Sequence, residues 1–465
     1  MERQRAEARK AWVGSGDAAT EAIWFDLREK HGATEFLGYA GTRGEGKIQA
    51  LVQGGKELPE ATQGADVAIV VNQTPFYAES GGQAGDTGEI RTKGARVRVR
   101  DTAKRLGDLH VHMGVVEEGR LGVGDIVELD VDEGRRDRLR ANHSATHLVH
   151  EALRRTLGDH VTQKGSMVAE DRLRFDFAHP KPVSPDELDR IETLVNAMIR
   201  QNEAVNTRLM TPDEAINAGA LALFGEKYGD EVRVVSMGLD REGNRSYSVE
   251  LCGGTHVRRT GDIGLFKIVS ESAVSAGVRR IEALTGETAR RHFIEEEALL
   301  RQVSHALKVT PAQVNERVSS LLEERRKLER DLTEARRKLA MGGTSTNGPE
   351  VEALNGVSFI GQTLDGVPAK DLRGLADDAK KRMGSGIAAF VAVNDGKAAL
   401  LVGVTDDLSD RFNAVDLVRS GAAALGGKGG GGRPDMAQAG GPDGAAADKA
   451  LAAIREMIQD KAAAA

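Results

Sequence analysis

The sequence contains a single cysteine, Cys252, among 465 residues. One cysteine cannot form a disulfide within its own chain, so intrachain disulfide cross-links are excluded. No apolar run approaches the roughly 20 residues that a membrane-spanning helix needs. The first residues, "MERQRAEARKAW", are charged and lack the apolar core of a secretory signal. Together these absences predict a protein of the reducing cytoplasm without a membrane partner.

The composition is that of ordinary globular material, with 40% hydrophobic and 29% charged residues. A chain of this length is enough for roughly three domains. The net charge of −7 gives no global sign of nucleic-acid binding. Any surface that binds a nucleic acid is therefore expected to be local.

The first half of the chain divides into regions of different character. We interpret residues 1–30 as the remnant of a preceding helical domain, because "ERQRAEARKAW" resembles the last turns of a helix without an N-cap. Residues 31–135 contain alternating or continuous apolar runs between glycine-rich turns, a pattern typical of a small β-barrel or sandwich. Residues 136–285 combine helices with strands in no regular βαβ order. The predicted fold class is therefore α+β.

The second half begins with a helical connector at residues 286–345. Its apolar positions follow steps of four and three with one charged interruption, which is typical of a coiled coil. The positions of this seam are Val314, Val318, Leu321, Arg325 (the charged interruption), Leu328, Leu332, Ala335 and Leu339. The stretch "MGGTSTNGPE" at 341–350 is interpreted as a linker. Residues 346–465 alternate strand and helix patterns around a glycine-rich loop, "GGKGGGGRPDMAQAGG", and predict a small α/β domain.

Two pairs of side chains have the spacing of metal ligands. His143 and His147 are four residues apart on a predicted helix, so both project from one face and can converge on one ion. Cys252 and His256 have the same spacing in "ELCGGTHV". A lone cysteine is more often a small buried hydrophobic residue, but the two pairs together form the Cys/His set that zinc favours. His150 shares the helix face of His147, as a substitute ligand or a partner of the site.

Two other motifs do not carry the chemistry that they suggest. "GTRGEGKI" fits the phosphate-loop pattern, but Ile48 replaces the hydroxyl residue that holds magnesium. The glycine run before Arg433 is no dinucleotide fingerprint, because no GxGxxG lies between a strand and a helix there. It is interpreted either as a turn or as a loop whose backbone N–H groups contact phosphates.

Four segments resemble bacterial alanyl-tRNA synthetase beyond its aminoacylation core. They are "TPFYAESGGQAGDTG", "NHSATHLVHEALRRTLGDHVTQKGS", "ELCGGTHV" and "GGKGGGGRPDMAQAGG". The resemblance implies an editing domain over 31–285, made of a β-barrel part and a zinc-containing core. The helical connector follows. For residues 346–465 the resemblance implies a domain that binds tRNA and through which two copies of the chain can form a homodimer.

The resemblance also implies roles for individual residues. The ligands of one zinc ion would be His143, His147, Cys252 and His256. Gln163 and its neighbour Thr162 would be the catalytic residues of the editing pocket. The loop at Ser80, Gly81 and Gly82 would bind the substrate. Lys428 and Arg433 would contact tRNA beside the glycine run.

The implied activity is zinc-dependent hydrolysis of Ser-tRNA(Ala) and Gly-tRNA(Ala). The sequence departs from the family in lacking the arginine-bearing class II motifs on a core of the needed size. Ligation of alanine with ATP is therefore expected only if this chain is joined to, or partnered with, a separate class II core. The alternative is a non-catalytic tRNA-binding module with a structural zinc. A phosphoesterase of the DHH type is disfavoured, because no Asp-His-His occurs.

Overall fold

The computed structural model describes residues 18–221, 230–240, 245–340 and 350–463. The expected helix remnant "ERQRAEARKAW" and nearly all of the expected linker at 341–350 lie outside these residues. The chain divides into two compact units, Met1–Leu300 and Arg301–Ala465. Among the described residues, no helix combines the length and apolarity that crossing a membrane requires.

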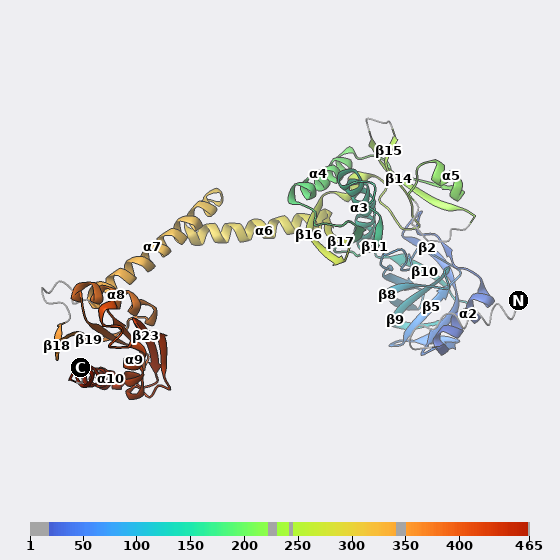
Figure 1. Ribbon diagram of the computed structural model, residues 1–465. Helices are drawn as coiled ribbons and strands as arrows, with labels where there is room; N and C mark the ends of the chain where they lie inside the picture. Colours follow the sequence, from blue (N-terminus) through green and yellow to red (C-terminus); the bar gives the residue numbers. More distant parts are fainter. Residues whose placement is uncertain (1–17, 222–229, 241–244, 341–349, 464–465) are drawn as a thin grey trace. The chain divides into compact units, whose positions relative to one another are not determined.

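The first part of unit 1 is a closed six-stranded antiparallel barrel (Figure 1). The strands follow one another in the order β10, β7, β8, β9, β5, β2, and β10 pairs with β2 to close the ring. This closure decides between the barrel and the sandwich, and the expected barrel is confirmed. The barrel strands are β2 (Arg43–Gln53), β5 (Asp66–Val71), β7 (Gly88–Arg91), β8 (Ala95–Arg105), β9 (Leu109–Gly122) and β10 (Ile126–Val131).

Short elements complete the barrel. α2 (Ala18–His31) covers it with Trp24 and Leu27, which pack against Ala50 and Val70. The interior is filled by alternating strand positions such as Ile48, a pattern that one buried strand face dictates. The short strands are β1 (Glu35–Phe36), β3 (Lys56–Leu58), β4 (Glu60–Thr62) and β6 (Gln73–Thr74).

The second part of unit 1 is built around the long helix α3 (Glu133–Leu157) (Figure 1). Asp132 caps this helix by accepting a hydrogen bond from the N–H of Arg135 at 2.9 Å. A four-stranded antiparallel sheet lies beside it in the order β11, β12, β17, β16. The strands are β11 (Gln163–Val168), β12 (Leu173–Ala178), β16 (Phe266–Ser275) and β17 (Val278–Thr285).

Helix α4 (Pro185–Gln201) begins as the sequence predicts, with Ser184 as N-cap of a capping box and proline in the first turn. A three-stranded sheet, short helices and a long helix complete the part. They are β13 (Asn206–Met210), α5 (Pro212–Asn217), β14 (Val232–Asp240), β15 (Arg245–Leu251), η1 (Thr260–Ile263) and α6 (Gly286–Leu307).

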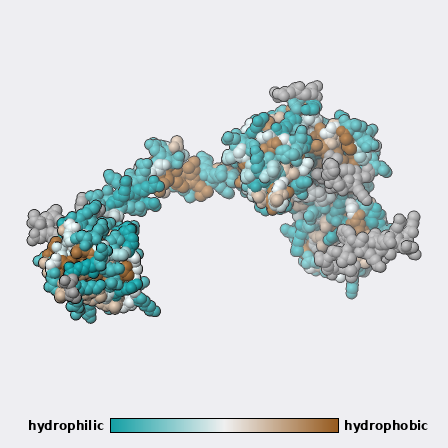
Figure 2. Space-filling model, in the orientation of Figure 1, coloured by the Kyte–Doolittle hydropathy of each residue, from teal (hydrophilic) through white to brown (hydrophobic). Residues whose placement is uncertain are grey.

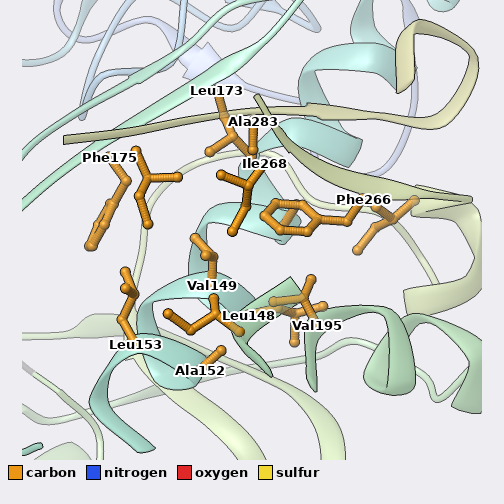
Figure 3. Close-up of a cluster of buried hydrophobic side chains, with 14 of the residues drawn as sticks. Leu148, Val149, Ala152, Leu153, Leu173, Phe175, Val195, Phe266, Ile268 and Ala283 are labelled. Atoms are coloured by element: carbon orange, nitrogen blue, oxygen red, sulfur yellow. The ribbon is translucent and has the colours of Figure 1, made fainter. Parts of the chain in front are cut away.

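One face of α3 packs into the main hydrophobic core of this part (Figure 3). Leu148, Val149 and Leu153 point from the helix toward Phe175 and Phe266 of the sheet (Figure 3). Burying such side chains contributes about 1.5–3 kcal/mol each. This packing fixes the rotation of α3 about its axis, and therefore fixes where its histidine-bearing face points.

The helical segment expected after residue 286 is present as α6, η2 (Pro311–Gln313) and α7 (Val314–Ala340). Figure 2 shows hydrophobic side chains gathered along α6, where Phe293 and Leu299 are exposed. In α7, the expected coiled-coil seam includes Leu328 and Leu332, which are also exposed.

The C-terminal part of unit 2 is a six-stranded sheet in the order β18, β19, β20, β21, β23, β22. Only β19 and β20 are parallel. Helix α8 covers one face of the sheet, while α9 and α10 cover the other. The elements are β18 (Glu352–Leu354), β19 (Val357–Asp365), η3 (Ala369–Asp371), α8 (Leu372–Met383), β20 (Ile387–Asn394), β21 (Lys397–Val404), η4 (Asp406–Leu408), α9 (Ala414–Ala424), β22 (Gly430–Arg433), β23 (Met436–Gly441), η5 (Gly444–Ala446) and α10 (Ala447–Ala463).

The prediction of a glycine-rich loop is wrong for residues 430–441. These residues form the hairpin β22–β23 at the sheet edge. Its glycines serve close packing. A Cβ on Gly430 would lie 2.5 Å from Cγ1 of Val418 in α9, so a side chain there would force this contact between helix and strand to change. Helix packing and strand pairing therefore override the weak strand propensity of glycine.

Candidate metal centre and its cavity

Three histidines form a stripe along α3. His143, His147 and His150 follow the spacing i, i+4, i+7 and therefore share one face of the helix. All three rings are buried, each with 7% or less of its surface exposed. Because the opposite face of α3 is packed into the core, the stripe has one fixed direction.

Cys252 and His256 come from the loop that follows β15. Arg233 of β14 holds this loop by donating hydrogen bonds to the carbonyl oxygens of Cys252, at 3.1 Å, and Gly254, at 2.8 Å. Gly254 is needed for close approach to α3. A Cβ at this position would lie 2.0 Å from Cε1 of His143, so any side chain would displace the His143 ring.

The four predicted ligands come together in the structure. Their donor atoms all lie within 4.8 Å of one another. Sγ of Cys252 is 3.4 Å from Nε2 of His143 and 3.3 Å from Nε2 of His256. A tetrahedral zinc site, with Zn–N near 2.0 Å and Zn–S near 2.3 Å, places nitrogen and sulfur about 3.5 Å apart. Nε2 of His147 is buried and has no hydrogen-bond partner in the described part of the chain. The donor set therefore fits a metal such as zinc.

Each histidine of the candidate metal site is held through its outer nitrogen. Nδ1 of His143 lies 2.7 Å from Oε1 of Gln83, and Nδ1 of His147 lies 2.7 Å from Oε2 of Glu250. Nδ1 of His256 lies 3.2 Å from Oγ of Ser144. Such outer partners fix the ring orientation and tautomer that leave Nε2 free for a metal.

The charges around the cluster favour the ligand forms of Cys252 and His256. Burial opposes ionisation of the Cys252 thiol, but the surrounding histidines hold its pKa well below the ordinary value. Burial lowers the pKa of His256 to about 3, so this ring is neutral at pH 7. Burial alone would raise the pKa of the Glu250 carboxyl, yet His147 and His150 beside it lower that pKa. Burial lowers the pKa of His147, but Glu250 and Cys252 beside it raise that pKa well above the ordinary value, so a metal would displace a proton from this ring. A thiolate, neutral imidazole and a supporting carboxylate are the states that metal binding requires.

The cluster lies on the wall of a cavity of about 840 Å³. This volume is within the usual range for small-molecule sites. Of the other predicted site residues, the structure places Ser80, Gly81, Thr162 and Gln163 around the same cavity. Gly82 does not line the cavity. It docks the loop instead, because Val168 donates a 2.7 Å hydrogen bond to its carbonyl oxygen.

The loop around Ser80 is a tight turn. Ser80 and Gln83 exchange backbone hydrogen bonds of 3.3 and 3.0 Å, and both intervening glycines have positive φ, 59° and 84°. A side chain is disfavoured at two such consecutive positions. A Cβ on Gly82 would also lie 2.5 Å from the carbonyl oxygen of Ser166.

Two residues predicted to contact tRNA lie in unit 2, at the edge hairpin. Lys428 is exposed just before β22. Arg433 ends that strand, and its guanidinium is 2.9 Å from the carboxylate of Asp435.

Sequence reasoning missed Gln83 and Glu250, although both are buried and touch ligand histidines. Gln83 also donates a hydrogen bond to Oγ1 of Thr255 at 2.8 Å and accepts one from the N–H of Thr255 at 3.0 Å. It thereby links the barrel to the metal loop. The only sequence signal for either residue is position, since Gln83 follows the glycine pair and Glu250 precedes Cys252 by two residues.

Three families match parts of the chain. The family described as "Threonyl and Alanyl tRNA synthetase second additional domain" matches residues 232–282, which include Cys252 and His256. The family described as "tRNA synthetases class II (A)" matches residues 1–135, and the DHHA1 domain matches residues 356–460.

Curated relatives match the chain from end to end. Alanine–tRNA ligases of Parvibaculum lavamentivorans and Mesorhizobium japonicum are each 59% identical to it, over 471 and 465 residues. The matches cover 100% and 99% of this chain but 53% and 52% of the relatives. The chain thus spans about half the length of the curated relatives it matches. Among solved structures, the C-Ala domain from Aquifex aeolicus alanyl-tRNA synthetase is 27% identical, with 24% of this chain and 98% of that chain covered and a TM-score of 0.23.

Proposed function

The chain belongs to the alanine–tRNA ligase family, and we propose that it hydrolyses Ser-tRNA(Ala) and Gly-tRNA(Ala) in a zinc-dependent editing reaction. The relatives' name supports tRNA(Ala) as the partner. The match of residues 232–282 to an additional domain of threonyl and alanyl tRNA synthetases supports an activity beyond ligation. Ligation of alanine would need a class II core joined to or partnered with this chain.

One observation carries the proposal, namely that the Cys/His cluster lies on the wall of a cavity. A structural zinc is usually enclosed by its four protein ligands and by packed side chains. Here His143, His147 and Cys252 line a space of about 840 Å³ that is large enough for an aminoacyl-adenosine group. The space also has polar walls on the side of Thr162 and Gln163.

The reaction is the addition of water to an ester carbonyl and the release of the tRNA's terminal ribose hydroxyl. Zinc held by His143, His147, Cys252 and His256 would supply a positive centre that polarises or positions the substrate. The chain's own residues must exclude bulk water and orient the ester. The loop at Ser80 and Gly81 is suited to this, because its glycine turn is docked on β11 and keeps the cavity wall fixed.

Selectivity is the harder task, because serine differs from alanine by one hydroxyl and glycine by one methyl. An apolar pocket separates such near-isosteres poorly, while a group that pairs with a hydroxyl discriminates strongly. Gln163 is half-buried on the cavity wall, and its Nε2 lies 3.4 Å from Oγ of Ser166. We assign recognition of the seryl hydroxyl to Gln163 or Thr162.

The test is deacylation of seryl-, glycyl- and alanyl-tRNA(Ala) by the zinc-loaded chain, side by side. We expect rapid release of serine and glycine and slow release of alanine. A non-catalytic tRNA-binding module with a structural zinc is the competing function. It predicts that all three esters decay at the rate of buffer alone while tRNA still binds, and that result would replace the proposed function.

We further propose that the C-terminal part binds tRNA through its phosphates, with Lys428 and Arg433 at the edge hairpin, and offers a surface for a homodimer. The match to the DHHA1 domain covers this part. A chain ending at residue 343 is expected to bind tRNA(Ala) more weakly and with a shallower salt dependence, because phosphate contacts release counterions. Equal affinities and equal salt slopes for the full and shortened chains would exclude this role.

A further inference from the structure

His150 is buried beside the Cys/His cluster, and only one of its two ring nitrogens has a hydrogen-bond partner among the described residues. Its exposed fraction is 5%, and its Nδ1 lies 3.0 Å from Oε1 of Glu250. Its Nε2 is buried and has no hydrogen-bond partner in the described part of the chain. An unpaired buried nitrogen costs free energy, so the arrangement calls for a partner that enters the cavity.

Four buried histidine Nε2 atoms lack a partner among the described residues. That of His147 is accounted for by the metal cluster. His31 and His179 do not line the cavity. His150 is the remaining one, and its ring is part of the cavity wall.

Glu250 fixes which nitrogen of His150 carries the proton. An ionised carboxylate accepts hydrogen bonds and cannot donate them. Nδ1 of His150 therefore donates to Oε1 of Glu250, while Nδ1 of His147 donates to Oε2 of the same carboxylate. Nε2 of His150 then carries a lone pair, on a ring that is part of the cavity wall.

His150 is placed to act beside the metal cluster without belonging to it. It is three residues after His147 on α3, so the two rings are neighbours on one helix face. The group of mutually close donor atoms contains His143, His147, Cys252 and His256 but not His150. The four clustered side chains can therefore bind an ion, while His150 stays available to accept a proton.

We propose that His150 is the general base of the hydrolysis, an inference that rests on the proposed function. Nε2 of His150 takes a proton from water as the water oxygen bonds to the ester carbonyl carbon. The bond between that carbon and the ribose oxygen then breaks, and the imidazolium returns the proton to the ribose oxygen. The products are the free amino acid and the terminal hydroxyl of the tRNA, and His150 is neutral again.

The experiment measures the single-turnover rate constant for Ser-tRNA(Ala) at saturating protein, together with zinc content and thermal unfolding. His150→Asn keeps an amide that donates to Glu250 but removes Nε2. His150→Ala leaves space for added imidazole. His179→Asn is the matched control, since His179 is equally buried, bonded at Nδ1 to His160 at 2.9 Å and unpaired at Nε2, but lies outside the cavity.

We expect His150→Asn to lower the rate constant about 100-fold or more, in the range usual for losing a general base. Zinc content and unfolding temperature should match those of the unmodified chain. Imidazole should restore part of the rate of His150→Ala, and His179→Asn should hydrolyse normally.

A His150→Asn rate close to that of the unmodified chain would overturn the inference. So would a rate loss in both His150 variants that only follows zinc loss. If His150→Asn does not fold, His150→Gln replaces it, and lack of imidazole rescue in folded His150→Ala counts against the base. An unmodified chain that hydrolyses nothing would instead overturn the proposed function itself.

Discussion

Histidines are buried in two regions of unit 1, and they are satisfied in different ways. In the barrel, Nε2 of His112 lies 2.8 Å from Oγ1 of Thr74, and its Nδ1 lies 3.0 Å from the carbonyl oxygen of Ile69. On α3, His147 and His150 each have one nitrogen on Glu250 and the other unpaired. Among the described residues, α3 leaves two unpartnered Nε2 atoms on rings of the cavity wall, whereas the other unpartnered buried histidine Nε2 atoms, those of His31 and His179, belong to rings outside the cavity.

This difference separates a structural histidine from a functional one. A buried polar atom without a partner costs about 1–3 kcal/mol, so two of them on one helix face would be a defect in a region that only had to be stable. The same atoms become useful when a metal ion and a substrate supply the missing contacts.

The largest effect is expected from Cys252→Ala. Removing the thiolate deletes a strong metal bond, so zinc content should fall to a small fraction and deacylation of Ser-tRNA(Ala) should be lost, by about 1,000-fold or more. Metal analysis and deacylation kinetics measure both. Cys252→Ser keeps a weaker oxygen ligand, so its zinc content and deacylation rate should lie between those of the unmodified chain and those of Cys252→Ala. Full zinc occupancy with normal turnover in Cys252→Ala would remove Cys252 from the site.

The next effect concerns the polar wall of the cavity. Gln163→His introduces a bulkier ring that pairs imperfectly with a seryl hydroxyl, so hydrolysis of Ser-tRNA(Ala) should fall about 10- to 100-fold. Zinc content and tRNA affinity should stay unchanged, since Gln163 contacts no ligand histidine among the hydrogen bonds of the described residues. Gln53→His, at an exposed end of β2, is the control. If Gln163→His hydrolyses Ser-tRNA(Ala) at the rate of the unmodified chain, Gln163 does not recognise the seryl hydroxyl.

A smaller effect is expected from the outer partner of His143. Gln83→Leu removes the amide that holds Nδ1 of His143 and the N–H of Thr255. Loss of such a partner typically weakens metal binding 10- to 100-fold. Competition with a chelator measures the zinc affinity. Gln63→Leu in an exposed barrel turn should have no effect, and equal affinities for the two variants would show that Gln83 does not support the site.

The smallest effect on activity is expected from His112. Burial lowers its pKa to about 4 from 6.5, so the folded state binds fewer protons than the unfolded state between these values. The contribution of His112 to the free energy of unfolding is fully present above pH 6.5. It is lost as the pH falls toward 4, and the total loss is about 3 kcal/mol. His112→Gln should flatten this part of the stability curve in denaturant titrations. Zinc content should stay normal, and a loss of zinc would contradict the purely structural role.

The sequence predicted the parts of the site that local spacing encodes. His143 and His147 share a helix face, and Cys252 and His256 share one turn, so four-residue spacing is visible in the letters. Gln83 could not be found this way, since its partner His143 lies 60 residues away. The strand β22 was missed for the same reason, because its pairing with β23 and its contact with α9 decide its conformation, whereas glycine alone favours a turn.

A small β-barrel or sandwich was predicted from alternating apolar positions, but the pattern did not decide between the two. Whether the strands close or stack as a sandwich depends on the contact between β2 and β10, which begin 83 residues apart at Arg43 and Ile126. The domain boundaries at 30, 135, 285 and 345 remain predictions.

X-ray absorption at the zinc edge of the purified chain identifies the atoms that bind the metal. We propose that one zinc ion is held by Cys252 together with His143, His147 and His256 through Nε2. The spectrum should then fit one sulfur at about 2.3 Å and three imidazole nitrogens at about 2.0–2.1 Å, with the sulfur contribution lost in Cys252→Ser. A zinc shell without sulfur, or a chain that binds no zinc, would contradict it.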